Sequence, residues 1–130
     1  YSVYEDTVLD PFWGTGTTSV ASAISGRNSI GYEIEGQFGK VYEKRINNTP
    51  TLSQKRNSKR LEDHVRFIEE RKSNGKSLKY ENDFYGFGVT SKQEKGIKLY
   101  DVNSVEKSKS VTSFEYEPHL IQRQMFSGMA

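Results

Sequence analysis

The sequence has no cysteine and no long hydrophobic run. Without cysteine, neither a disulfide framework nor a thiolate metal site is possible. One of its two histidines, His64, is expected on a helix face rather than on a metal, so no metal site is predicted. No segment approaches the length of a membrane span or resembles a signal peptide. These absences indicate a cytoplasmic protein that does not act at a membrane.

The chain is short and has few apolar residues. Its 130 residues are 33% hydrophobic and 28% charged. A chain of this length makes at most one domain with a modest core. Aromatic residues, 12% of the sequence, add large apolar surfaces to that core.

Residues 6–18, DTVLDPFWGTGTT, are the most informative segment. An apolar run leads into a glycine-rich turn and then a helix, and a glycine backbone can approach a nucleotide-like ligand closely. A second apolar run ends at Glu33, 17 residues after Gly16. A carboxylate at the end of the next strand can accept hydrogen bonds from ribose hydroxyls. The segment therefore predicts a cofactor that contains a nucleoside.

Two common nucleotide-binding motifs do not match this turn. The dinucleotide motif G-x-G-x-x-G fails because Ser19 stands at the third glycine position, and a P-loop would need a lysine after Gly16. What remains is Asp-Pro-Phe-x-Gly-x-Gly-Thr-Thr at residues 10–18, followed by GRNSIGYEIE at residues 26–35. Residues 5–46 resemble the S-adenosylmethionine-binding segment of DNA amino-methyltransferases, which methylate N4 of cytosine or N6 of adenine in DNA.

The resemblance implies a set of cofactor-binding residues. Asp10 and Phe12 would flank the methionine portion and the sulfonium, Glu33 would bind the ribose hydroxyls, and Ile34 would pack on the adenine. The alternatives are that Asp10-Pro11 is a strand-ending turn and that Glu33 is an ordinary solvated acid. The implied residues are Asp10, Pro11, Phe12, Gly14, Gly16, Thr17, Thr18, Glu33 and Ile34.

The same resemblance gives the turn its own roles. Gly14 and Gly16 would let the backbone pass beneath the cofactor. Thr17 and Thr18 would open the helix with hydroxyls that cap free N–H groups.

No catalytic residue is predicted, because the family's catalytic loop, Asp/Ser/Asn-Pro-Pro-aromatic, has no counterpart here. The three prolines are never adjacent, and residues 82–85, Asn-Asp-Phe-Tyr, lack them. In one permuted branch of the family this loop precedes the cofactor motif. We therefore expect the chain to be the C-terminal part of a split or truncated enzyme, inactive alone and completed by an N-terminal half.

Basic residues concentrate in the middle of the chain. Residues 44–79 hold eleven basic and four acidic side chains. Such an excess suits contact with DNA phosphates. The alternative is a solvated helix face with pairs such as Glu62–Arg66. The predicted DNA contacts are Lys55, Arg56, Lys59 and Arg60.

Periodicity and turn residues predict an α/β protein that contains a parallel βαβ unit, with an irregular extension of helix and short strands. The resemblance implies that this unit is part of a Rossmann-like methyltransferase fold. The predicted division is 1–46 for cofactor binding and 47–130 for the extension. In the first part we expect strands at 7–10 and 27–32 and helices at 17–25, closed by Gly26, and 36–46. In the second we expect a polar loop at 47–57, a helix at 58–72, short strands at 96–102 and 113–116, and a mobile link at 103–113.

The aromatic segment 80–89 could stack on bases, but packing on the main domain is favoured.

Three functions fit these patterns. The first is a site-specific DNA methyltransferase fragment or subunit of a restriction–modification system, using S-adenosylmethionine, with N4 of cytosine favoured over N6 of adenine. The second is a non-catalytic remnant that binds DNA or a partner. The third is a methyltransferase that acts on RNA or protein, which the basic middle region disfavours.

Overall fold

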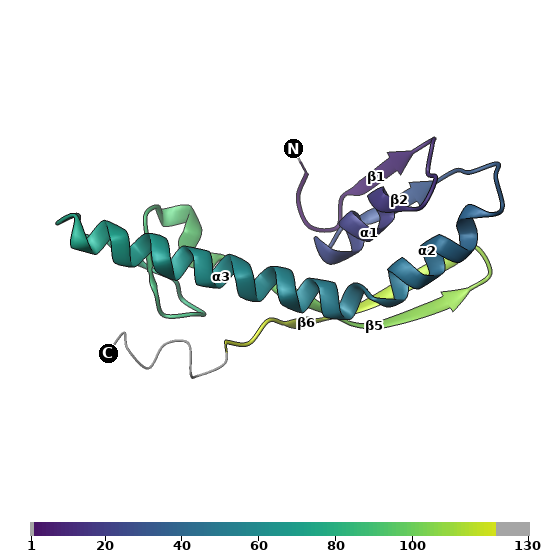
Figure 1. Cartoon of the computed structure of the whole chain (residues 1–130). Coiled ribbons are helices and arrows are strands. Elements are labelled where there is room, and N and C mark those ends of the chain that lie inside the picture. Colours follow the sequence, from purple (N-terminus) through teal and green to yellow (C-terminus); the bar gives the residue numbers. More distant parts are fainter. Residues whose placement is uncertain (1, 122–130) are drawn as a thin grey trace. The chain divides into compact units, whose positions relative to one another are not determined.

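A computed structural model describes residues 2–121 (Figure 1). The chain divides into two compact units, Tyr1–Lys55 with Tyr100–Glu117, called unit 1, and Arg56–Leu99 with Pro118–Ala130, called unit 2. The domain division at residue 46 stays a prediction.

Unit 1 begins with the predicted parallel βαβ arrangement. Strand β1 (Thr7–Asp10) leads to helix α1 (Thr17–Ile24), which returns to strand β2 (Asn28–Gly31). The strands are parallel, with Leu9 opposite Ile30. The mixed α/β class and the parallel βαβ unit are therefore confirmed, with element ends within two residues of those predicted.

Helix α1 ends where Gly26 requires it. Gly26 has φ +70°, a left-handed conformation that suits glycine. Its N–H donates to the carbonyl of Ala23 at 3.2 Å, and the N–H of Arg27 donates to the carbonyl of Ser22 at 2.9 Å. This pair of bonds is the Schellman motif, which satisfies carbonyl groups at the end of the helix.

The C-terminal part of unit 1 is a β-hairpin, which corrects the mobile link predicted at 103–113. Strands β5 (Tyr100–Ser108) and β6 (Val111–Pro118) are neighbours joined by two residues, a connection typical of antiparallel strands. Phe114 packs against the buried Val20, Ala23 and Ile46. The serine- and lysine-rich composition that suggested a link lies at the solvent-exposed end of the hairpin.

Helix α2 (Phe38–Asn47) supplies Ile46 to this core. Its Tyr42 hydroxyl lies 3.2 Å from the hydroxyl of Thr112 in β6. The Tyr116 hydroxyl donates to the carbonyl of Ala23 at 2.7 Å, and burial raises the pKa of Tyr116. The hairpin therefore packs on α1 and on α2.

Helix α3 (Thr49–Ser73) covers residues 49–57 of the segment 47–57 that was predicted as a polar loop, so that prediction was wrong. Pro50 is tolerated because it lies in the first turn. Three of the polar side chains that suggested a loop, Thr49, Ser53 and Asn57, are buried. The Thr49 hydroxyl donates to the carbonyl of Ile46 at 2.7 Å, and the Ser53 hydroxyl accepts from the N–H of Val102 at 2.9 Å.

Unit 2 packs short elements against α3. Strands β3 (Tyr80–Glu81) and β4 (Gly88–Val89) are antiparallel, and a 3-10 helix, η1 (Lys92–Gly96), follows them. The core contains Leu61, Phe87, Val89 and Leu99. Phe87 of segment 80–89 thus packs inside unit 2 with Tyr85 against the same core, whereas Tyr80 and Phe84 are exposed. The strand predicted at 96–102 begins only at Tyr100.

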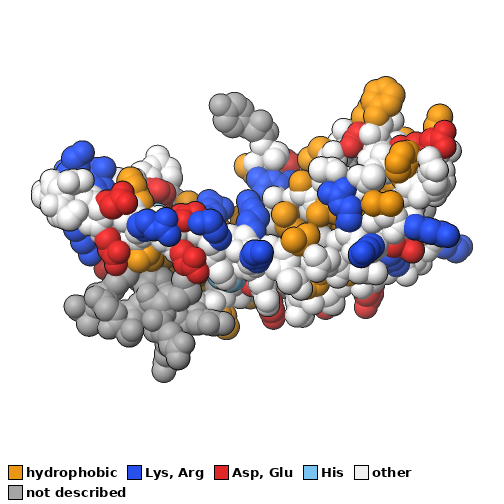
Figure 2. All heavy atoms as spheres, viewed as in Figure 1, with side chains coloured by type: hydrophobic (Ala, Val, Ile, Leu, Met, Phe, Trp, Pro, Cys, Tyr) orange, Lys and Arg blue, Asp and Glu red, His pale blue; other side chains and the backbone are white. Residues whose placement is uncertain are grey.

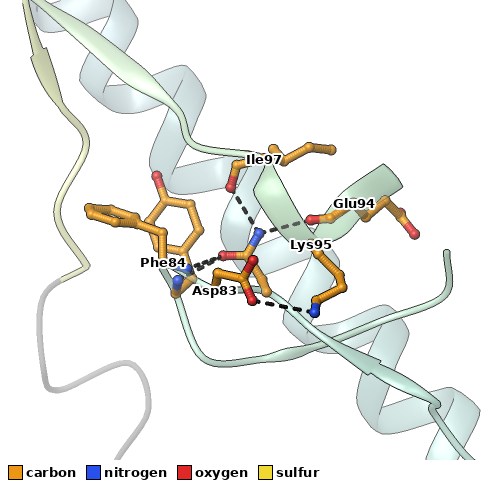
Figure 3. A network of polar contacts seen from close by, with 7 residues as sticks. Asp83, Phe84, Glu94, Lys95 and Ile97 are labelled. Atoms are coloured by element: carbon orange, nitrogen blue, oxygen red, sulfur yellow. Dashed lines mark hydrogen bonds and ion pairs between the residues drawn. The ribbon is translucent and has the colours of Figure 1, made fainter. Parts of the chain in front are cut away.

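Asn82 organises the loops of unit 2. Figure 3 shows the polar contacts that reach Phe84, Glu94 and Ile97 in these loops. Its buried amide nitrogen donates to the carbonyl groups of Glu94 and Ile97, at 2.9 and 2.8 Å. Its amide oxygen accepts from the N–H groups of Phe84 and Tyr85, at 3.0 and 2.7 Å. The side chain uses its full hydrogen-bonding capacity on the backbone of two segments.

Candidate functional site

The loops that follow β1 and β2 lie together at the carboxyl ends of the two strands. The N–H of Tyr32 donates to the carbonyl of Asp10, and the N–H of Trp13 donates to the carbonyl of Tyr32, both at 3.0 Å. The Asp10 carboxylate accepts from the N–H of Phe12 at 3.1 Å, closing a tight turn around Pro11. Parallel α/β sheets bind ligands at this edge.

Glu33 connects the two loops. Its Oε2 accepts from the N–H of Gly14 at 2.7 Å, and its Oε1 accepts from the N–H of Glu35 at 2.9 Å. These backbone donors, Glu35 first and then Gly14, hold the pKa of Glu33 below its ordinary value. The predicted acid therefore stands at the glycine turn, where it fixes the turn's first glycine.

This contact predicts a pH-dependent stability. A lowered pKa means that the Glu33 carboxylate stabilises the folded state above pH 4.5, the ordinary glutamate value. This stabilisation is lost as the pH falls through the folded-state pKa. We expect the melting-temperature difference between the parent and Glu33→Gln to be constant above that pH and to shrink below it. Glu35→Gln is the control, because within residues 2–121 the Glu35 carboxylate makes no ion pair. A difference that stays constant down to about pH 3, well below the glutamate range, would contradict this role.

Two apolar side chains of the predicted site point into solvent. Phe12 is 88% exposed and Ile34 is 97% exposed. Leu9 and Ile30, which are paired on one face of the sheet, are also exposed, at 63% and 49%. Figure 2 shows hydrophobic atoms at the surface over β1 and β2. This apolar surface is available to a ligand or to another protein segment.

The two glycines of the turn have different surroundings. Both are left-handed, Gly14 at φ +54° and Gly16 at φ +75°. A Cβ at Gly14 would come no closer than 4.0 Å to the carbonyl oxygen of Phe12, so this position is open. A Cβ at Gly16 would overlap the ring of Tyr42 and lie 3.0 Å from Trp13 Cζ2. Only Gly14 therefore leaves free space above the backbone.

The predicted capping role of Thr17 and Thr18 was wrong. Gly16 is the N-cap of α1, and no side chain caps the helix. The Thr17 hydroxyl instead accepts from Nη1 of Arg45 at 2.9 Å. Thr17 is already the first residue of α1, so the N-cap position falls on Gly16.

Trp13 and Arg45 were not predicted as site residues. The indole Nε1 of Trp13 donates to the Ser19 hydroxyl at 2.8 Å, and its ring lies 4.3 Å from that of Tyr42. A Cβ at Gly31 would overlap the indole, so the indole packs directly on the end of β2. Trp13 lies within the motif and is the single tryptophan, which is a signal that the sequence offered.

The predicted DNA contacts lie on α3 and are exposed. Lys59 pairs with Asp63 at 2.9 Å, and Arg66 lies 3.8 Å from the same carboxylate. The hydrogen bond from Lys59, more than the charges nearby, holds the pKa of Asp63 below its ordinary value. Part of this helix face is thus a solvated ion-pair surface, although the pair expected between Glu62 and Arg66 is made by Asp63. The four predicted residues are Lys55, Arg56, Lys59 and Arg60.

The described residues contain neither a metal-binding cluster nor a membrane-spanning helix. Between residues 2 and 121, no three His, Cys, Asp or Glu side chains gather in a way that could hold a metal ion. None of the helices in that range is both long and apolar enough to cross a membrane.

Comparisons with known proteins show which family and which relatives the chain is similar to. The family model described as DNA methylase, of the N6 and N4 type, matches residues 1–44. The chain is similar to the type II methyltransferase M.MthZI of Methanothermobacter thermautotrophicus, with 47% identity over 116 residues, 89% of this chain and 31% of that protein. It is also similar to M.MjaI of Methanocaldococcus jannaschii, with 52% identity over 35% of this chain and 15% of that protein.

A third relative is M.HinfI of Haemophilus influenzae, with 54% identity over 32% of this chain and 11% of that protein. No solved structure matches the chain significantly. The chain thus spans about a third, or less, of the length of these relatives. The motif, the family model and the similarity to M.MthZI along most of the sequence agree, and the chain belongs to the DNA amino-methyltransferase family.

Proposed function

We propose that the chain is the S-adenosylmethionine-binding part of a site-specific DNA methyltransferase, in a cytoplasmic restriction–modification system. The reaction transfers a methyl group to the N4 amine of cytosine or the N6 amine of adenine. Residues 1–46 form the cofactor-binding part of a Rossmann-like domain in the permuted branch, whose catalytic loop precedes this segment. The type II methyltransferases similar to the chain support this proposal.

The observation that carries the proposal is the bond between Glu33 and the N–H of Gly14, at the carboxyl ends of two adjacent parallel strands. It places a carboxylate, an open glycine and the exposed side chains of Phe12 and Ile34 on neighbouring loops. A carboxylate suits ribose hydroxyls, and exposed apolar side chains suit an adenine ring and a thioether chain.

The cofactor-binding residues in this proposal remain those of the motif. Asp10 and Phe12, on either side of Pro11, flank the methionine portion, and Ile34 packs on the adenine. Gly14 gives the cofactor room, while Gly16 and the threonines that follow set the start of α1. Glu33 binds the ribose, either by exchanging its bond to Gly14 or by adding ribose hydroxyls to its remaining acceptor sites.

S-adenosylmethionine supplies an activated methyl group. In the transfer, a bond forms between the amine nitrogen and the methyl carbon while the bond from carbon to sulfur breaks, and the amine proton is released. Positioning accounts for most of the rate in such a reaction. We propose that the loop that orients the amine comes from a complementary N-terminal half, because the chain covers 31% of M.MthZI.

Ultraviolet cross-linking of methyl-labelled S-adenosylmethionine tests this proposal directly. We expect label on the peptide that contains Phe12, competition by S-adenosylhomocysteine, and no competition by ATP. The matched variant Phe12→Ala should lose the label, and Phe84→Ala, an exposed phenylalanine of unit 2, should keep it. Label spread over unrelated peptides, or removed equally by ATP, would contradict the proposed site.

DNA is the proposed macromolecular partner of the basic face of α3, with Lys55, Arg56, Lys59 and Arg60 contacting phosphates. Phosphate contacts make the logarithm of the DNA-binding constant fall linearly with the logarithm of the salt concentration, with a slope of roughly 0.9 per contact. The double variant Lys55→Ala/Arg60→Ala should therefore reduce the slope by about 2, measured by fluorescence anisotropy with duplex DNA. Lys40→Ala/Lys92→Ala, at exposed lysines elsewhere, is the charge-matched control. An equal loss in both pairs, or stronger binding to RNA, would argue against this surface.

A further inference from the structure

Arg45 holds the glycine turn from the far end of α2. Its Nη1 lies 3.2 Å from the carbonyl oxygen of Thr15, 2.8 Å from the Thr15 hydroxyl and 2.9 Å from the Thr17 hydroxyl. These partners lie 28 to 30 residues away in the sequence. One guanidinium group therefore ties the last turn of α2 to the turn between the two glycines and to the first residue of α1.

The turn needs such a contact because its own residues do little to fix it. Thr15 stands between two left-handed glycines, which have the largest conformational freedom of any residue. The N-cap of α1 is Gly16, which has no side chain to bond the first N–H groups. Glu33 fixes the turn at Gly14, and Arg45 fixes it at Thr15 and Thr17.

The charge of Arg45 is placed unfavourably for helix α1 itself. A cation in the last turn of α2 is favourable there, but beside the first turn of α1 it adds to the positive end of that helix dipole. The same arrangement favours an anionic ligand group near the turn, because the guanidinium charge and the dipole act in the same direction. A carboxylate, as in the methionine portion of the proposed cofactor, has the matching charge.

We propose that Arg45 is a positioning residue for S-adenosylmethionine, which it serves through Thr15 and Thr17. It keeps the glycine turn in its binding shape before the ligand arrives, so that less ordering has to accompany binding. This inference rests on the proposed function. Arginine suits the role better than lysine because its planar group holds the N–H groups of Nη1 in fixed directions, whereas the ammonium group of lysine rotates.

Affinity for S-adenosylmethionine in three variants is the first test. Arg45→Ala should weaken binding about tenfold, as expected for the loss of one charge-assisted contact that preorganises the site. Arg45→Lys should recover part of the affinity, because it keeps the charge but does not hold its N–H groups in fixed directions. Lys44→Ala is the matched control: it removes the same charge from the same helical turn, at an exposed side chain. Equal weakening by Lys44→Ala would overturn the proposal.

Amide hydrogen exchange separates this inference from the proposed function, since it needs no ligand. The N–H of Gly16 bonds to the carbonyl of Trp13 at 3.0 Å, so its exchange reports the opening of the turn. Arg45→Ala should speed this exchange at least about tenfold and leave Val89 in unit 2 unchanged. If the parent fails to bind S-adenosylmethionine, the proposed function fails, and faster Gly16 exchange still supports the anchoring role. Unchanged Gly16 exchange, or a lowered melting temperature with unchanged affinity, would overturn the positioning role.

Discussion

Replacing Gly16 by alanine is expected to destabilise the chain by about 2–5 kcal/mol. Two effects add. The residue has φ +75°, which costs an L-residue roughly 1–2 kcal/mol. The new methyl group would also overlap the ring of Tyr42 and press on Trp13, and overpacking of this kind costs about 1–3 kcal/mol. Urea unfolding followed by the fluorescence of Trp13, the single tryptophan, measures the loss directly.

Gly14→Ala is the matched control for this prediction. Its φ of +54° carries a similar conformational cost, but a Cβ there finds no atom closer than 4.0 Å. We expect a loss of about 1–2 kcal/mol, from the backbone alone. Gly14→Val should in addition abolish cofactor binding, because its side chain fills the open space. Equal destabilisation at the two glycines would show that Tyr42 and Trp13 do not pack beneath Gly16 as described.

Asn82→Ala is expected to destabilise unit 2 by about 3–5 kcal/mol, near the upper end for a point substitution. The substitution removes four hydrogen bonds to the backbone, from Phe84 and Tyr85 and to Glu94 and Ile97. A net hydrogen bond contributes about 1 kcal/mol, and backbone groups left buried without a partner add to the cost. Thermal unfolding by circular dichroism and amide exchange at Tyr85 measure the effect.

Asp83→Ala is the control for this prediction, because it changes the neighbouring residue and leaves the Asn82 amide in place. The Asp83 carboxylate lies 3.7 Å from Nζ of Lys95 in an exposed pair (Figure 3). Exposed pairs contribute at most about 1 kcal/mol. Asn82→Asp should be nearly as damaging as Asn82→Ala, because a carboxylate cannot donate to the two carbonyl groups. If Asn82→Ala and Asp83→Ala cost the same, the amide is not the organising group of these loops.

Residues 5–46 were largely predictable because their signals are local. The strand that ends at Asp10, the glycine turn and the acid at Glu33 follow one another in a recognisable order. The helix end marked by Gly26 is likewise local, since this glycine takes the left-handed conformation just past the helix. Such signals need no information about distant segments.

The errors at 47–57 and 103–113 have the opposite origin. Ser53 is buried in a helix because it accepts a hydrogen bond from Val102, 49 residues away. Tyr116 bonds to Ala23, 93 residues away, and this contact helps to hold the hairpin on α1. Polar composition alone predicts loops in both segments, since the partners that satisfy these polar groups are not visible in the local sequence.

The candidate site likewise contains residues that could be predicted from the sequence and one that could not. Asp10, Gly14 and Glu33 belong to a motif and could be recognised from the sequence. Arg45 could not, because an arginine near the end of a predicted helix is usually a solvated residue. Only the fold shows that its guanidinium reaches Thr15 and Thr17.

Calorimetric titration of the 130-residue chain with S-adenosylmethionine tests the central claim most directly. We expect saturable binding with a stoichiometry of one in the parent. Glu33→Ala should weaken this binding by about tenfold or more, from the loss of hydrogen bonds to a charged group. Circular dichroism and the Trp13 signal establish that both proteins are folded. A folded parent that gives no binding heat at several temperatures would contradict the account, as would a Glu33→Ala variant that binds like the parent.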